Sequence, residues 1–259
     1  KGYFGVVGMF GGNPAMHPLF ADLCDVLRQH IPREQRGLWC NNPLGKGAIM
    51  RATFDPAVSN LNVHLDRTAY EEFKRDWPEC NPVGLVHDSR HSTPFVAMKD
   101  LIEDEGERWS LISECDINQH WSAMIGVFRG ELRAWFCEVA GAQAMLHQND
   151  PDYPDTGLKV VARLGTSYLF RDPTWWRFSM HYFRHQVSKH CHECGVPLRG
   201  YGELAQTADD AGEEQTTETH MKVYRPKRLR RNVEIVTSLQ QLGVGKLAMT
   251  TDYLGNAKR

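Results

Sequence analysis

The sequence predicts an α/β protein. We expect a partial (β/α) barrel over residues 1–105, a small α+β domain with a β-hairpin over residues 106–205, and a C-terminal extension over residues 206–259. In the first part, apolar strand-like runs alternate with amphipathic helical stretches, which favours a parallel sheet. A charged run over residues 104–108 indicates a boundary, and after it two apolar runs are joined by a short turn that contains Gly130.

Composition narrows the class of protein further. The 259 residues are 41% hydrophobic and 24% charged, with 30 Lys and Arg against 32 Asp and Glu. A net charge of −2 lacks the basic excess of a general nucleic-acid binder. No apolar run is long enough for a membrane span and no secretion signal is visible, so we expect a cytoplasmic protein without a membrane partner. In that reducing compartment, the seven cysteines favour metal binding over disulfides.

The first part of the chain is typical of repeated strand–helix units. Residues 3–10 form a buried parallel strand in this interpretation. A helix over residues 18–30 follows, and its apolar face holds Leu19, Leu23 and Leu27, with Phe20, Cys24 and Val26 beside them. Residues 37–40 are the next strand. Residues 60–65 then alternate as a strand.

A further helix follows that strand. Asp66 is its predicted N-cap, Tyr70, Phe73 and Trp77 share its apolar face, and residues 83–86 form the strand after it.

The second part is expected to begin with a hairpin of residues 124–128 and 132–136. A loop at 149–154 precedes a helix that starts at Asp172-Pro173 and runs to His190. Residues 206–218 are acidic and predict a solvated loop. The basic run 225–231 predicts a solvated face, with a phosphate or nucleic-acid site as the alternative.

Gly11-Gly12-Asn13-Pro14 lies between the first strand and its helix. Ligands of α/β proteins bind at the carboxyl ends of strands, and glycines there let a ligand approach the backbone closely. The same four residues also suit a plain tight turn.

Four cysteines form a candidate metal site. Cys191-His192-Glu193-Cys194 is a C-x-x-C pair, and the predicted hairpin brings the segments of Cys115 and Cys137 together. Four thiolates suit zinc or an iron–sulfur cluster equally. A thioredoxin-like redox pair is disfavoured because the motif follows a helix, while four nearby histidines leave a mixed-ligand zinc site open: His181, His185, His190 and His192. We interpret Cys24, Cys40 and Cys80 as structural.

These residues together resemble the radical S-adenosylmethionine (SAM) enzymes that carry a SPASM- or Twitch-type auxiliary iron–sulfur domain. Residues 7–14 are similar to the family's second strand with its Gly-Gly-Glu-Pro motif, with Asn13 in place of Glu, and residues 37–42 are similar to its third strand. The order Cys115, Gly130, Cys137 and C-x-x-C resembles the auxiliary domain, although six residues rather than four separate Gly130 from Cys137.

The resemblance implies a fold, cofactors and partners. It implies a radical-SAM-type barrel, SAM, and [4Fe–4S] clusters, of which the auxiliary one is held by Cys115, Cys137, Cys191 and Cys194. When reduced, the catalytic cluster yields a 5′-deoxyadenosyl radical that abstracts a substrate hydrogen. The substrate would be a peptide, a protein or a small carbohydrate, and the electron donor a flavodoxin or ferredoxin. The implied SAM-binding residues are Gly11, Gly12, Asn13, Pro14, Asn41, Asn42, Asn62 and His64.

One defining motif is missing. The family's C-x-x-x-C-x-x-C, which holds the catalytic cluster, occurs nowhere in these 259 residues. Because that motif belongs upstream of the second strand, we expect an N-terminally incomplete chain that is inactive alone. Two alternatives remain: a non-catalytic relative whose four cysteines hold a structural zinc ion, and an unrelated glycosyl or nucleotide transferase that uses Gly11-Gly12 for phosphate.

Overall fold

The computed structural model describes residues 3–11, 13–64, 66–85, 96–115, 123–159, 179–198, 214–222 and 233–242. Two compact units divide the chain: the described residues up to Leu85 belong to unit 1, and those from Val96 onward to unit 2. The division falls before Met98 and Ile102, which pack in the core of unit 2, and therefore earlier than the boundary expected near residue 105.

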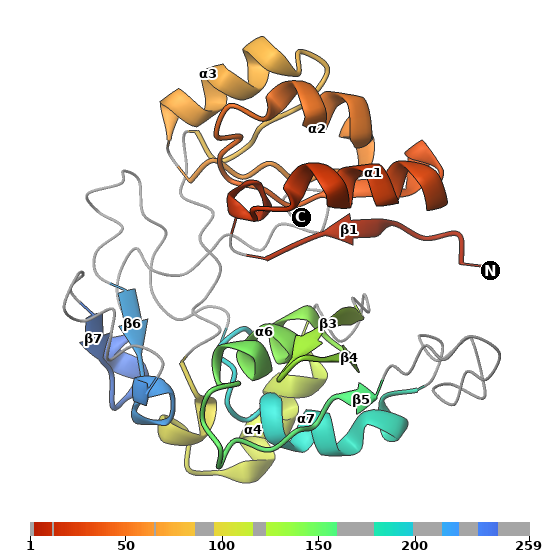
Figure 1. Ribbon diagram of the computed structural model, residues 1–259. Helices are drawn as coiled ribbons and strands as arrows, with labels where there is room; N and C mark the ends of the chain where they lie inside the picture. Colours follow the sequence, from red (N-terminus) through yellow and green to blue (C-terminus); the bar gives the residue numbers. More distant parts are fainter. Residues whose placement is uncertain are drawn as a thin grey trace, which may run out of the picture. The chain divides into compact units, whose positions relative to one another are not determined.

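Unit 1 is a short parallel sheet with helices between its strands. Figure 1 shows α1 (Phe20–His30), α2 (Gly47–Thr53) and α3 (Arg67–Asp76) above β1 (Val7–Met9). Its strands pair with Val7 opposite Arg36 and Met9 opposite Leu38. The pairing continues through single parallel bridges, Trp39 to Asn60 and Asn62 to Val83, in chain order. Within the described residues this arrangement is open rather than a closed barrel. The elements are β1 (Val7–Met9), η1 (Pro14–Met16), α1 (Phe20–His30), η2 (Arg33–Gln35), β2 (Arg36–Leu38), α2 (Gly47–Thr53), η3 (Pro56–Val58) and α3 (Arg67–Asp76).

Helix α1 buries only part of the apolar face that was predicted, and the predicted burial of Cys24 is confirmed. Phe20 and Cys24 are buried, whereas Leu19 and Leu23 are 55% and 40% exposed. The helix begins at Phe20, with Leu19 as its N-cap, and Leu27 is the only leucine of the expected stripe that packs against the core. The predicted burial of Leu19 and Leu23 was therefore wrong. Leucines spaced four residues apart are compatible with either of two adjacent helix faces, and the face that holds Phe20 and Cys24 is the buried one.

Helix α3 has the predicted cap and core face. The Asp66 carboxylate accepts a hydrogen bond from the Ala69 backbone N–H at 3.0 Å, and Phe73 and Trp77 are fully buried. These side chains pack with Leu38, Leu61 and others in the core of unit 1.

Unit 2 is built on the predicted hairpin, with β3 and β4 antiparallel and Met124 opposite Trp135. Arg129 (φ 49°) and Gly130 (φ 80°) form its two-residue turn. Gly141 lets α6 approach this sheet, since a Cβ there would lie 3.0 Å from the Trp135 ring. The elements of unit 2 are η4 (Met98–Asp100), α4 (Glu105–Ser113), β3 (Met124–Phe128), β4 (Glu131–Trp135), α6 (Glu138–Leu146), β5 (Leu158–Lys159), η6 (Met180–Phe183), α7 (Arg184–His190), β6 (Glu214–Thr216), η7 (Glu218–His220), β7 (Val233–Ile235) and η8 (Leu239–Gln241).

Two segments of unit 2 differ from the predictions. The charged run at 104–108 is not a turn but the start of α4, because Asp104 caps the helix by accepting from the Glu107 N–H at 2.6 Å. The acidic segment is not solvated where it is described: Gln215, Thr216 and Thr217 are buried, and β6 pairs in parallel with β7. The predicted helix start at Asp172 and the basic run 225–231 lie outside the described residues.

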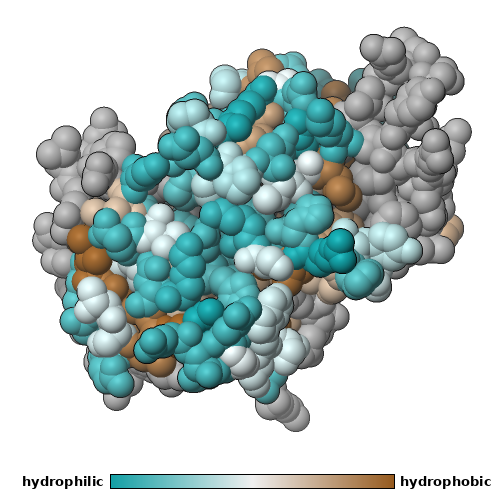
Figure 2. Space-filling model, turned by 90° about the horizontal axis from the view of Figure 1, so that it is seen from below, coloured by the Kyte–Doolittle hydropathy of each residue, from teal (hydrophilic) through white to brown (hydrophobic). Residues whose placement is uncertain are grey.

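The surface view in Figure 2 is mainly hydrophilic, with hydrophobic side chains in small separate areas. Among the described helices, none has both the length and the apolar character that crossing a membrane requires.

Candidate functional site

The predicted SAM-binding residues of unit 1 follow successive parallel segments. We call the described residues of 11–14, 40–42 and 62–66 the rim. Gly11 adopts φ 126°, and a Cβ there would meet no atom of the described residues within 4 Å, so this side of its backbone is not covered by them. Gly12 lies outside the described residues.

Asn13 ties two rim loops together. Its side-chain oxygen accepts from the Ala15 N–H at 3.0 Å, and its amide donates to the Asn42 carbonyl at 2.9 Å. The Cys40 thiol lies 3.1 Å from Asn13 Oδ1 and 3.2 Å from the Asn42 carbonyl. Burial raises the pKa of Cys40 to about 11, so this thiol stays protonated and serves as a donor.

A second link joins the next loop. Asn42 Nδ2 donates to Asp66 Oδ2 at 3.3 Å, and the His64 N–H donates to Asn62 Oδ1 at 3.1 Å. His64 has φ 47°, a left-handed conformation that costs free energy in a non-glycine residue. The hydrogen bonds thus bring the loops of Asn13, Asn42 and Asp66 together, while Asn62 and His64 bond to each other.

Two side-chain oxygens of unit 1 are buried without a hydrogen-bond partner among the described residues. Asn41 Oδ1 and Asn60 Oδ1 are shielded from solvent and have no hydrogen-bond partner within the described residues. Because unpaired buried oxygens are costly, they suit a ligand that brings donors. The sequence interpretation did not identify Lys46, because no local sequence pattern indicates it. The Lys46 ammonium donates a hydrogen bond to the Ala15 carbonyl at 2.5 Å, which places a cation beside η1.

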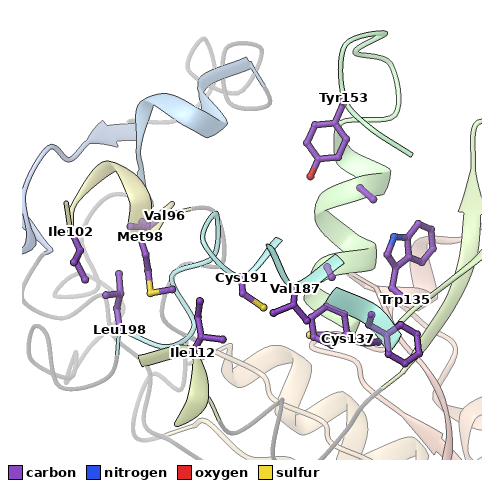
Figure 3. Close-up of a cluster of buried hydrophobic side chains, with 14 of the residues drawn as sticks. Val96, Met98, Ile102, Ile112, Trp135, Cys137, Tyr153, Val187, Cys191 and Leu198 are labelled. Carbon is purple, nitrogen blue, oxygen red and sulfur yellow. The ribbon is translucent and has the colours of Figure 1, made fainter. Parts of the chain in front are cut away.

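The four predicted metal ligands of unit 2 line one cavity of about 20 Å³. They come from the segment after α4, the N-terminus of α6 and the turn after α7. Figure 3 shows Cys137 and Cys191 in the hydrophobic core beside Val187. The other lining residues are Phe136, Val139, Ala140, Gln143, His190, Val196 and Pro197.

The local backbone prepares two of these thiols to bind a metal. Cys137 is the N-cap of α6, so its thiol lies at the helix N-terminus, where the Val139 and Ala140 backbone amides act to lower its pKa. The Val196 N–H lies 3.4 Å from the Cys194 sulfur. Amides at a helix N-terminus stabilise negative charge, and therefore favour a metal-bound thiolate.

Without a metal, the thiols of Cys137 and Cys194 are neutral. Burial raises the pKa of Cys137 and Cys194 well above the usual thiol value. Neighbouring charges add to this effect: Glu138 and Cys194 raise the pKa of Cys137, and Cys115 and Cys191 raise that of Cys194. Burial also raises the pKa of Glu138 to about 8. A bound cation would reverse this balance by releasing the thiol protons.

The four cysteine side chains that line the cavity are not arranged as metal ligands. Among the described residues, no three Cys, His, Asp or Glu side chains are arranged to hold a metal ion as they lie. The cavity has room for about one water molecule, so binding requires the thiols to turn toward a common centre.

Of the four nearby histidines, two are exposed and two form hydrogen bonds with other side chains. His181 and His185 are exposed. His190 is buried and bonds to Thr156 at 2.7 Å, and burial lowers its pKa to about 3. His192 accepts from Arg108 at 3.2 Å.

The sequence interpretation did not predict the buried polar network around Glu193. Glu193 Oε1 accepts from Lys99 at 2.5 Å and from Lys189 at 2.8 Å. His147 and His220, both buried, bond to each other at 3.2 Å. These residues are far apart along the chain, so no spacing pattern could have joined them.

Comparison of the chain with protein-family models, with curated proteins and with solved structures gave no match.

Proposed function

We propose that this chain is part of a cytoplasmic radical SAM enzyme, in which unit 1 binds SAM at the rim and unit 2 holds an auxiliary [4Fe–4S] cluster. The observation that carries the proposal is that Cys115, Cys137, Cys191 and Cys194, from three separate segments, line one buried cavity. In a reducing compartment, four buried cysteines that line one cavity suit metal ligation better than any other role.

The rim supplies the second half of the proposal. Gly11 leaves the backbone open at the end of β1, and Asn41 offers a buried oxygen without a partner among the described residues. With SAM and a catalytic cluster bound, one electron from a flavodoxin or ferredoxin would cleave SAM, and the radical released would abstract a hydrogen atom from a peptide, protein or small carbohydrate substrate. The residues of this chain position SAM: Asn13 fixes the loop after β1 relative to the loop after β2, and Lys46 suits a carboxylate.

A structural zinc site in a non-catalytic relative is the second candidate. The small size of the cavity favours it, because a single ion requires smaller displacements of the four thiols than a cluster does.

Metal analysis of the full chain distinguishes the two. The chain is purified and reconstituted without oxygen, and iron, sulfide and zinc are measured. We expect about four iron and four sulfide per chain, and loss of most of both on changing Cys137 or Cys194 to alanine. Cys24→Ala is the matched control, because Cys24 is equally buried but lies in the core of unit 1.

If the chain contains zinc but no iron, the structural zinc site is supported and the iron–sulfur cluster is ruled out. Full metal content in the Cys194→Ala variant would contradict both candidates. Since C-x-x-x-C-x-x-C is absent, the reconstituted chain alone is expected to release no 5′-deoxyadenosine from SAM.

A further inference from the structure

The carbonyl of Glu193, between the two cysteines of the C-x-x-C turn, accepts two hydrogen bonds from buried side chains. Gln143 Nε2 donates to it at 2.9 Å, and His220 Nε2 lies 2.6 Å from it. Both Gln143 and His220 are 0% exposed. Two buried donors on one carbonyl hold the peptide that leads into Cys194 in a fixed plane.

The hydrogen-bond pattern fixes the tautomer of each histidine. A carbonyl only accepts, so His220 carries its proton on Nε2, and its Nδ1 accepts from His147 Nε2 at 3.2 Å. Burial lowers the pKa of both rings, to about 4 for His147, in agreement with neutral imidazoles. On the other side, Gln143 Oε1 lies 3.3 Å from His190 Nδ1, and His190 Nε2 accepts from Thr156.

The two donors come from elements that are themselves secured. Gln143 lies on α6, and Cys137 is the N-cap of the same helix. His220 ends η7, which is fastened to the start of unit 2: the Ala97 N–H donates to Thr217 Oγ1 at 2.9 Å, and Thr219 donates to Asp100 through its N–H and its hydroxyl at 2.9 and 2.8 Å. The C-terminal segment around η7 is therefore built into the neighbourhood of the cysteines.

We propose that Gln143 and His220 form a carbonyl clamp that positions Cys194, and through it the C-x-x-C turn, to bind metal. The proposal rests on the proposed function in one respect, that the four cysteines are ligands. Groups that orient metal ligands from outside the coordination sphere contribute strongly to affinity. In this chain the orientation acts through the backbone: the clamped carbonyl and the Cys194 N–H share one peptide plane, and that N–H donates to the Cys191 carbonyl at 3.3 Å.

Cobalt titration of the full reduced chain tests the clamp. Co²⁺ is the probe, because its bonds to thiolates give absorption bands that report the number and geometry of the sulfur ligands. His220→Phe keeps a ring but removes the donor, whereas His220→Gln keeps an amide donor near the position of Nε2. His30→Phe, the same exchange at an exposed histidine of α1, is the matched control.

We expect His220→Phe to weaken Co²⁺ binding by about 10- to 100-fold and to alter the cobalt spectrum. His220→Gln should restore most of both, and His30→Phe should match the wild type. Gln143→Met, which removes the other donor at similar volume, should weaken binding in the same direction. Folded His220→Phe and Gln143→Met variants with wild-type affinity and spectrum would overturn the clamp.

Two further results separate the clamp from the metal site. If the wild-type chain gives no thiolate–cobalt bands, the metal site fails and the clamp fails with it. If the wild type binds and His220→Phe does not fold, ¹⁵N NMR of the wild type decides: a proton on Nε2 of His220 supports the clamp, and a proton on Nδ1 overturns it.

Discussion

At the scale of single residues, Asn13 gains a contact that a glutamate at its position would lack. Its amide N–H donates to the Asn42 carbonyl, whereas a carboxylate only accepts. The side-chain oxygen meanwhile caps η1 through the Ala15 N–H. The departure from the Gly-Gly-Glu-Pro pattern therefore adds a link between the loops after β1 and β2.

We predict that Asn13→Ala lowers the free energy of unfolding by about 1 kcal/mol, because it removes both the cap and this link. Asn13→Asp should lose less, since its carboxylate keeps the cap. Urea unfolding followed by tryptophan fluorescence measures both variants. Equal stability of Asn13→Ala and the wild type would show that the link contributes nothing.

His147 gives the chain a predicted sensitivity to acid. Its ring stacks on Tyr153 with centroids 4.4 Å apart, and burial together with the neighbouring His220 lowers its pKa to about 4. An unfolded histidine titrates near pH 6.5, so below that pH the unfolded state binds more protons than the folded state. Stability should therefore be constant with respect to this group above pH 7 and fall as the pH drops from 6.5 toward 4.

The comparison of wild type with His147→Phe, which keeps the stacking ring but cannot titrate, isolates this effect. Between pH 7 and pH 5 the wild type should lose on the order of 1 kcal/mol more stability than the variant. Denaturant midpoints at the two pH values provide the measurement. Parallel losses in both proteins would assign the acid sensitivity to other groups.

At the scale of elements, the hairpin turn does more than join β3 to β4. Both of its residues are left-handed, the arrangement that matches the twist of a two-residue hairpin. The Arg129 guanidinium then donates to the carbonyls of Gln148, Asp150 and Tyr153 at 3.0, 2.6 and 3.0 Å, so the turn also anchors the loop after α6.

Gly130→Ala should lower the free energy of unfolding by about 1 kcal/mol. The new Cβ meets no atom of the described residues within 4 Å, so the cost comes from the backbone conformation. Gly130→Asn is the control, because asparagine tolerates the left-handed region and should stay closer to the wild type. Chemical denaturation measures both, and an Asn variant less stable than the Ala variant would refute this explanation.

At the scale of the whole molecule, each unit has a hydrophobic core of its own, and all four candidate ligands belong to unit 2. Metal binding stabilises only the unit that holds the site. Zn²⁺ should therefore slow hydrogen exchange in peptides from α6 and α7, and leave peptides from α1 and α3 unchanged. Equal protection in both units would indicate that the metal acts on the chain as a whole.

The sequence predicted what local chemistry determines. The hairpin turn, the Asp66 cap and the Phe73–Trp77 face depend on residues within a few positions of one another, and the structure has all three. On α1, Leu19 and Leu23 were wrongly predicted to face the core, whereas Cys24 was predicted correctly. Helix α4 was missed because its N-cap, Asp104, lies in a charged run that was interpreted as a turn. The clamp depends on contacts between residues as distant as Glu193 and His220, which leave no periodic signal.

The position of His220 along the chain has a consequence for synthesis on the ribosome. All four cysteines leave the ribosome before His220, which follows Cys194 by roughly 26 residues, or about 1 to 5 s at 5–20 residues per second. During that interval the C-x-x-C turn has emerged without one of the two donors to its central carbonyl. The nascent chain thus passes through a stage in which every thiol is present but the Glu193 carbonyl has only one of its two donors, and the arrival of η7 supplies the second.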